Sequence, residues 1–234
     1  SVKYFLEDAL SAMDEISRAG KIPLLVGGTM LYFRALEKGL SKLPQINSKI
    51  RDMIKKDLFE KGIEFLYSQL KMVDPNISKR IHKNDTQRIT RALEVFQQTG
   101  QPLSEFQKKS LKQKMPYRAI KFARMPENRE SLYKSIDSRF EKMLSIGFED
   151  EVKRLIDRGD LNAEMPSMRA VGYRQMWDYL HGDCSYGEIV KKGQAASRQL
   201  AKRQMTWLRS ELNTNWLDNF NKNSISKVEK KLKI

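Results

Sequence analysis

The stretch KIPLLVGGTMLYFRAL, residues 21–36, decides the fold class. Its first part, Ile22–Val26, is a short apolar run, which is typical of a buried strand in a parallel sheet. Gly27-Gly28-Thr29 then predicts a tight turn, and residues 30–38 have the spacing of a helix that ends at Gly39. A strand followed by a turn and a helix is half of a βαβ unit. The sequence therefore predicts an α/β fold, a parallel sheet with flanking helices.

The sequence changes character after Leu43. Residues 44–111 contain several helical patterns and no strand pattern, and Asp85 is a good N-cap for one of these helices. We therefore predict that residues 44–111 form an inserted all-helical subdomain. Residues 1–43 and 112–234 would together make the α/β core.

The α/β pattern resumes after the insertion. Ser185 and Glu188 have the spacing of a capping box that would open a long helix. The lysine-rich tail is expected to be solvated and frayed. The elements predicted outside the insertion, besides those of the opening stretch, are helices at 3–19, 128–145, 148–158, 172–180 and up to about Ser210, a strand at 117–125, an edge strand near Trp216 and the tail at 221–234.

The chain is strongly basic. Its 44 Lys and Arg against 29 Asp and Glu give a formal net charge of +15. This balance favours a polyanionic partner such as nucleic acid, because each neutralised phosphate releases counterions. The single cysteine, Cys184, favours a reducing compartment, and two histidines are too few for a zinc site. No apolar run approaches the roughly 20 residues that span a bilayer, so we expect no membrane partner. Together with the cysteine content this favours a cytoplasmic protein, and a monomer is the default expectation.

The first candidate site is the glycine pair before Thr29. Ligands bind beyond the carboxyl ends of parallel strands, and glycines there let a ligand approach the backbone. A plain strand-to-helix turn with Thr29 as its N-cap is an equally good interpretation. The segment is not a P-loop, because no G-x-x-x-x-G-K-[ST] pattern occurs in the sequence.

The second candidate site lies in NDTQRITRALE, residues 84–94. Gln87, Arg91 and Glu94 share one helical face, with Arg88 beside Arg91. An amide next to two guanidinium groups suits contacts to base edges and phosphates. The alternative is a solvated face with an ordinary Arg91–Glu94 pair.

The third candidate site combines RAVGYR, residues 169–174, with a basic stripe on the predicted long helix. The stripe follows helical spacing, and aromatic and apolar residues occupy the neighbouring face, as on a helix laid along a nucleic-acid backbone. A solvated helix with long cationic side chains is the alternative. The stripe consists of Arg198, Lys202, Met205 and Arg209.

Four motifs, IPLLVGGTMLYFRAL, NDTQRITRALEVF, RAVGYRQMW and RQLAKRQMTWLR, together resemble the bacterial tRNA dimethylallyltransferase (tRNA isopentenyltransferase) family, in the same order over nearly the whole chain. The resemblance implies a fold related to P-loop nucleotide kinases, with a helical insertion that closes over the anticodon loop. It also implies an activity, the transfer of a dimethylallyl group from dimethylallyl diphosphate to N6 of adenine 37 in the tRNA anticodon stem-loop.

The resemblance assigns roles to individual residues. Thr29 matches the threonine at the family's reaction centre, and Arg174 matches an arginine near the diphosphate, so both are catalytic candidates. The positions that match tRNA-contacting residues are Arg51, Gln87, Arg88, Arg91, Arg169, Arg174, Arg198, Lys202, Arg203 and Arg209.

The resemblance also implies groups outside these 234 residues. The family's P-loop and the aspartate proposed as its general base align upstream of Ser1. We therefore expect a fragment that does not transfer prenyl groups by itself, with most ligands of the implied Mg²⁺ cofactor in that upstream segment.

Two other functions stay open at the level of sequence. One is a non-catalytic module that binds an RNA stem-loop, and the other is a small-molecule phosphotransferase of the nucleotide-kinase type. A steep fall of RNA affinity with salt would exclude the phosphotransferase. A labelled prenyl group on adenine would exclude passive binding.

Overall fold

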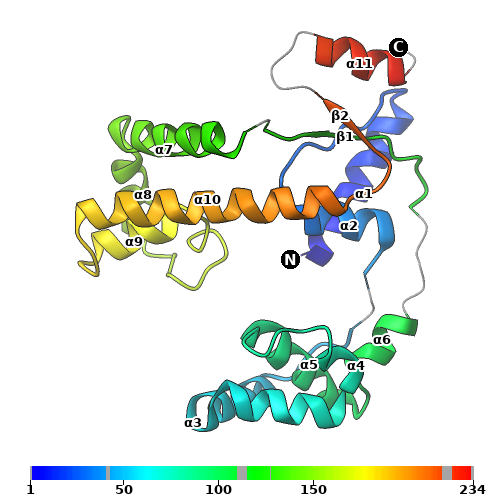
Figure 1. The fold of residues 1–234 in the computed structure, drawn as a ribbon, viewed down its shortest axis with the longest axis vertical. Helices are drawn as coiled ribbons and strands as arrows, with labels where there is room; N and C mark the ends of the chain where they lie inside the picture. The colour runs from blue at the N-terminus through cyan, green and yellow to red at the C-terminus, as the bar shows by residue number, and fades with distance from the viewer. Residues whose placement is uncertain (1, 41–42, 110–114, 127, 218–222, 233–234) are drawn as a thin grey trace. The chain divides into compact units, whose positions relative to one another are not determined.

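The computed structural model describes residues 2–40, 43–109, 115–126, 128–217 and 223–232. Its contacts divide the chain into two units (Figure 1). The first unit consists of Ser1–Leu25 and Leu31–Arg118, and the second of Val26–Met30 and Ala119–Ile234. The predicted grouping of residues 1–43 with 112–234 stays a prediction.

The first unit opens with two helices at the expected places. They are α1 (Val2–Arg18) and α2 (Met30–Lys38). Phe5 of α1 stacks on Tyr32 of α2, with 4.2 Å between ring centroids. The predictions of helices at 3–19 and 30–38 are confirmed.

Every described element within residues 44–111, the predicted insertion, is a helix, and its status as an inserted subdomain stays a prediction. Its helices are α3 (Ser48–Val73), α4 (Pro75–Ser78), α5 (Thr86–Thr99) and α6 (Leu103–Lys109). Asp85 caps α5 by accepting a hydrogen bond from the Arg88 N–H at 3.1 Å. Gly100 ends α5 in the left-handed conformation, with φ of 69°, which glycine adopts without strain.

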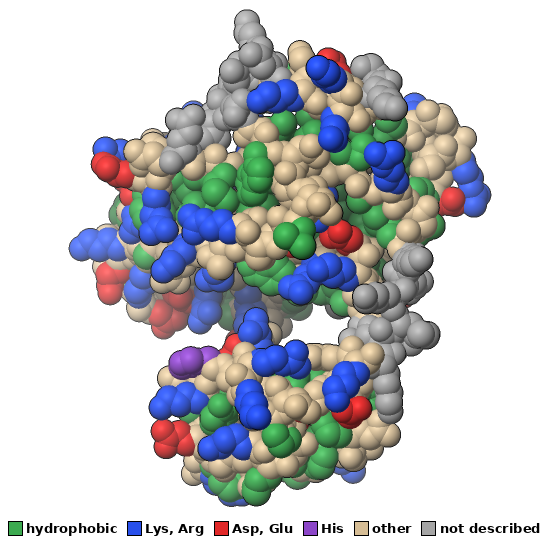
Figure 2. Space-filling view, turned by 45° about the vertical axis from the view of Figure 1, so that its right-hand side comes forward, with side chains coloured by type: hydrophobic (Ala, Val, Ile, Leu, Met, Phe, Trp, Pro, Cys, Tyr) green, Lys and Arg blue, Asp and Glu red, His purple; other side chains and the backbone are tan. Residues whose placement is uncertain are grey.

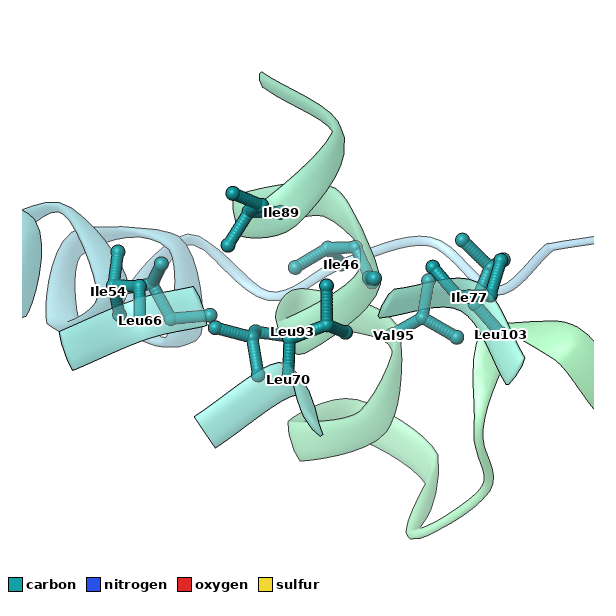
Figure 3. Packing of buried hydrophobic residues seen from close by; sticks show 10 residues of the cluster. Ile46, Ile54, Leu66, Leu70, Ile77, Ile89, Leu93, Val95 and Leu103 are labelled. Carbon is teal, nitrogen blue, oxygen red and sulfur yellow. The ribbon is translucent and has the colours of Figure 1, made fainter. Parts of the chain in front are cut away.

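The core of the insertion lies between α3 and α5 (Figure 3). Leu70 of α3 is fully buried, as are Ile89 and Val95 of α5. Asp74 is also buried, and its carboxylate accepts hydrogen bonds from the Ile77 N–H at 3.0 Å and the Ser104 N–H at 2.8 Å. One side chain therefore joins the start of α4 to the start of α6.

The second unit is organised around α10 (Tyr186–Ser210), the long helix opened by the predicted Ser185–Glu188 capping box. Other helices of this unit are grouped along one part of α10 (Figure 1). They are α7 (Arg129–Ser145), α8 (Phe148–Asp157) and α9 (Tyr173–Leu180). Met168, Met176 and Ile189 are buried in their shared core.

The two described strands, β1 (Lys121–Arg124) and β2 (Thr214–Leu217), pair in parallel, with Lys121 opposite Thr214. The Lys121 ammonium lies 3.1 Å from the Glu211 carboxylate, and the Asn215 amide donates to the Lys121 carbonyl at 2.9 Å. These contacts fix the register at one end of the pair. The predictions of strands near 117–125 and Trp216, and of a parallel sheet, are confirmed.

The predicted strand at Ile22–Val26 and the predicted fraying of the tail are wrong, whereas most described tail residues are exposed, as expected of a solvated segment. Ile22–Val26 is not a strand, and the side chains of Leu24 and Val26 are 79% and 85% exposed. An apolar run becomes a strand only where a neighbouring strand supplies ladder partners, and no described strand pairs with it. The tail contains a helix, α11 (Asn223–Leu232), because Ile225, Val228 and Leu232 repeat at helical spacing.

Within the described ranges, no helix combines the length and apolar character that a bilayer-spanning segment requires.

Candidate functional site

The candidate residues of the insertion meet at one carboxylate. The Arg51 Nε of α3 lies 3.8 Å from Glu94 Oε1, and the Arg91 Nη1 of α5 lies 3.2 Å from Glu94 Oε2. The Glu94 side chain is only 12% exposed, whereas those of Arg51 and Arg91 are 51% and 39% exposed. The carboxylate is thus covered by two guanidinium groups that still face solvent.

Gln87 and Arg88 lie one turn away on α5, and both are exposed. The Arg88 Nε lies 3.4 Å from Asp85 Oδ2, so the capping residue also restrains this guanidinium. Ile89 and Leu93 fill the opposite face of the helix and are buried. The structure therefore brings Arg51, Arg91, Gln87 and Arg88 to one polar surface, which we call the insertion patch.

In the second unit, the Thr29 loop lies against α10. The Gln204 Nε2 donates a hydrogen bond to the Gly28 carbonyl at 3.1 Å. Thr29 is exposed directly beside this contact. The loop is thus held by a helix that is far from it in the sequence.

Arg169 and Arg174 line the same cavity of about 290 Å³, together with Glu164, Trp177 and Asp178. Both arginines are exposed, and neither forms an ion pair with a described carboxylate. Two unpaired guanidinium groups at one cavity suit an anionic group, because each can present a fork of N–H donors. The structure therefore places both arginines of the RAVGYR motif at one cavity, and their roles stay predictions.

The backbone around Arg174 is held in place by contacts of the two preceding residues, Gly172 and Tyr173. Gly172 has φ of 97°, and a Cβ there would lie 3.4 Å from the Phe148 ring. The Gly172 N–H donates to the Gln175 side chain at 2.8 Å. The Tyr173 hydroxyl donates to the Glu151 carboxylate, and this hydrogen bond, with burial second, raises the pKa of Tyr173 above its ordinary value. Arg174 therefore projects from a fixed helix start.

The basic stripe on α10, taken together with the adjacent Arg203, divides into two parts. Lys202, Arg203 and Arg209 are exposed, and none forms an ion pair with a described carboxylate. Arg198, in contrast, binds Asp137 of α7, with 2.6 and 2.7 Å from its Nη1 to the two carboxylate oxygens. Its role as a tRNA contact stays a prediction, and in this structure it fastens α7 to α10.

A shallow groove of about 350 Å³ runs along the free part of the stripe, lined by Gln199, Lys202, Arg203, Thr206 and Trp207. Figure 2 shows Lys and Arg side chains across the visible face of both units, with fewer acidic ones among them. The excess of Lys and Arg over acidic residues therefore lies at the surface, where it can contact a polyanion.

Sequence reasoning missed one contact, between Arg51 and Glu94, and two supporting residues, Gln204 and Glu151. The i, i+3 spacing indicated the Arg91–Glu94 pair but not the contact with Arg51, which depends on how α3 packs on α5. Gln204 and Glu151 carried no signal, because their partners are distant in the sequence. Residue type alone does not reveal such contacts.

The described residues do not fit a metal ion held by protein ligands. Among them no group of three or more His, Cys, Asp or Glu side chains is close enough to bind one. The expected Mg²⁺ cofactor stays a prediction.

The fold and the site define a basic, mostly helical protein with a small parallel sheet and two cationic surfaces. The family model described as IPP transferase matches residues 1–211. The chain belongs to this family, and the predicted family is thereby confirmed.

Solved structures agree with this assignment. The full-length tRNA isopentenylpyrophosphate transferase from Bacillus halodurans is 31% identical, with a TM-score of 0.65 over 100% of this chain and 73% of that one. The tRNA delta(2)-isopentenylpyrophosphate transferase from Staphylococcus epidermidis is 29% identical, with a TM-score of 0.64 over 100% and 76%. Both likenesses support the predicted fold class and the predicted class of enzyme, a tRNA prenyltransferase.

A eukaryotic dimethylallyltransferase acting on tRNA shares the fold at 23% identity, with a TM-score of 0.72 over 98% of this chain and 60% of that one.

Proposed function

We propose that this chain is part of the machinery that transfers a dimethylallyl group from dimethylallyl diphosphate to N6 of adenine 37, beside the tRNA anticodon. The observation that carries the proposal is the family match over residues 1–211, which includes all four sequence motifs. The two cationic surfaces supply the chemistry that a tRNA stem-loop needs.

The tRNA would be held by the insertion patch and by the α10 stripe. Lys202, Arg203 and Arg209 are free to neutralise phosphates along the stem, and Gln87 offers an amide to a base edge. Arg51 and Arg91 would contact phosphates while Glu94 keeps their guanidinium groups in place. Such contacts position the anticodon loop before any reaction.

The reaction needs an unstacked adenine, because N6 in a stacked base is shielded and its lone pair is delocalised into the ring. N6 then forms a bond to the allylic carbon, and the carbon–oxygen bond to diphosphate breaks with its electron pair leaving on the diphosphate. A proton passes from N6 to a general base, the role that the resemblance gives to an aspartate. Arg169 and Arg174 would stabilise the charge that develops on the phosphate oxygens. Thr29 would orient one reactant through its hydroxyl.

We further propose a monomer that acts in the cytoplasm. The single cysteine, Cys184, is a free, half-buried thiol, which fits a reducing compartment. Mg²⁺ would neutralise diphosphate charge in such a reaction.

The test incubates the intact protein that contains this chain with tRNA, Mg²⁺ and labelled dimethylallyl diphosphate. Label recovered on adenosine after nuclease digestion supports the proposal. Salt-sensitive tRNA binding without label would instead identify a passive RNA-binding module, and a lack of RNA binding would favour a small-molecule enzyme.

A further inference from the structure

A glutamine on α10 holds the loop that carries Thr29. The Gln204 Nε2 lies 3.1 Å from the Gly28 carbonyl oxygen and donates to it. Gly28 is half-buried, and Thr29 follows it directly. Any movement of the Gly28 peptide would therefore move the Thr29 backbone.

The contact is close enough that any side chain at residue 28 would displace the glutamine amide. A Cβ on Gly28 would lie 2.2 Å from the Gln204 Nε2 and 3.1 Å from the amide carbon. The glutamine amide thus occupies the space where any other side chain would begin. The hydrogen bond from Gln204 in its present position therefore depends on glycine at position 28.

Gln204 is itself on a rigid support. Its neighbour Met205 is 6% exposed and fixes the rotation of α10. Farther along the helix, Gly193 lies against the Phe140 ring and Arg198 binds Asp137, so α10 is fastened to α7. A side chain on a packed helix holds a loop more accurately than another loop would.

We propose that Gln204 is a positioning residue, which fixes the Gly28 peptide and through it the Thr29 hydroxyl at the reaction centre. The inference rests on the proposed function. Lys202 and Arg203 precede Gln204 on the same helix, so the residue lies where the tRNA-binding stripe meets the loop. Gln204 acts through Gly28 and does not touch substrate.

The kinetic test replaces Gln204 with methionine, which has a similar length and no donor. We expect kcat for prenyl transfer to fall about five- to tenfold, while KM for tRNA stays within twofold, because the lost hydrogen bond affects orientation rather than affinity. Gln194→Met is the matched control. Gln194 is a glutamine on the same helix that donates to Glu141 and lies outside both candidate surfaces, so this variant should retain wild-type kcat.

A double-mutant cycle adds a second readout. Gly28→Ala should displace the Gln204 amide, because the flexible side chain moves more easily than the backbone. Adding Gln204→Met to Gly28→Ala should then lower kcat no further. Fully additive losses would overturn the inference.

A structural readout separates this inference from the proposed function. The side-chain amide NMR signals of Gln204, identified by their loss in Gln204→Met, should shift in Gly28→Ala. They should not shift in Gly187→Ala, because a Cβ on Gly187 meets no atom within 4 Å. Unmoved signals in Gly28→Ala would overturn the contact itself, whatever the activity.

Two kinetic outcomes are also decisive. A wild-type protein that does not prenylate tRNA would overturn the proposed function and the positioning role together, with the NMR result unaffected. If the wild-type protein transfers the prenyl group and the Gln204→Met variant has the same kcat, the positioning role alone is overturned.

Discussion

Arg51 of α3 and Arg91 of α5 bind opposite oxygens of the same carboxylate, that of Glu94. The shared partner keeps two cations side by side at the surface of the insertion, where like charges would otherwise repel each other. Ion pairs this exposed contribute about 1 kcal/mol or less to stability. We therefore interpret the contacts of Glu94 as holding two guanidinium groups in place to bind a polyanion, rather than as a contribution to folding stability.

Arg91→Ala should weaken binding of an anticodon stem-loop. It should also reduce the slope of log K against log salt concentration by about 1, because one phosphate contact is lost. Fluorescence anisotropy at several salt concentrations measures both quantities.

Arg18→Ala is the control for this measurement. Arg18 is an exposed arginine of the same unit, paired with Asp14 at 2.6 Å and outside the predicted contacts. Equal effects of the two substitutions would show that Arg91 acts only through net charge.

Asp74→Ala should destabilise the insertion by about 2 kcal/mol or more, because the buried N–H groups of Ile77 and Ser104 both lose their acceptor. Asp74→Asn should cost less, since its amide oxygen can still accept from one of them. Urea unfolding followed by circular dichroism measures the difference. Asp52 is exposed, so Asp52→Ala should change stability by no more than about 0.5 kcal/mol. If Asp52→Ala destabilised the protein as much as Asp74→Ala, the structural role given to the buried Asp74 carboxylate would be contradicted.

How far the sequence predicts the structure depends on whether a signal is local. The Asp85 cap and the Ser185–Glu188 capping box are local signals, and the structure contains both. Ile22–Val26 fails as a strand because strand formation depends on a neighbour, which the apolar run does not specify.

The candidate site follows the same rule. Gln87, Arg88 and Arg91 lie on one helix, so spacing placed them together. The contacts of Glu94 with Arg51 and of Gln204 with Gly28 join distant segments, and only the packed structure reveals them.

Gly193→Ala should destabilise the second unit by about 1–3 kcal/mol, because a Cβ there would lie 2.1 Å from the Phe140 ring. Gly187→Ala on the same helix meets open space and should leave stability unchanged or slightly raised. Thermal unfolding of the two variants measures this contrast. Equal melting temperatures would mean that α7 and α10 do not pack so closely.

The start of α10 should loosen in acid. Hydrogen bonds from the Ser185 N–H and hydroxyl, at 2.8 and 2.9 Å, lower the pKa of Glu188 below its ordinary value. A lowered pKa stabilises the fold above the unfolded-state value, and this stabilisation is lost as pH falls through the folded-state value. An NMR titration of the Glu188 carboxyl measures the midpoint.

Of the two donors to the Glu188 carboxylate, Ser185→Ala removes the hydroxyl and keeps the backbone N–H, so the midpoint should move part of the way back toward the ordinary glutamate value. A midpoint that is the same in both proteins would contradict the role of the hydroxyl.

The most direct test of the central claim is transfer of a labelled dimethylallyl group from dimethylallyl diphosphate to anticodon stem-loops by the intact protein that contains this chain. We expect label on N6 of adenine 37 and none on a stem-loop with guanine at that position. Thr29→Ala should lower kcat/KM about tenfold, which corresponds to roughly 1.4 kcal/mol for one oriented hydrogen bond. Absence of label from every adenine-containing stem-loop, with tRNA binding intact, would contradict the account.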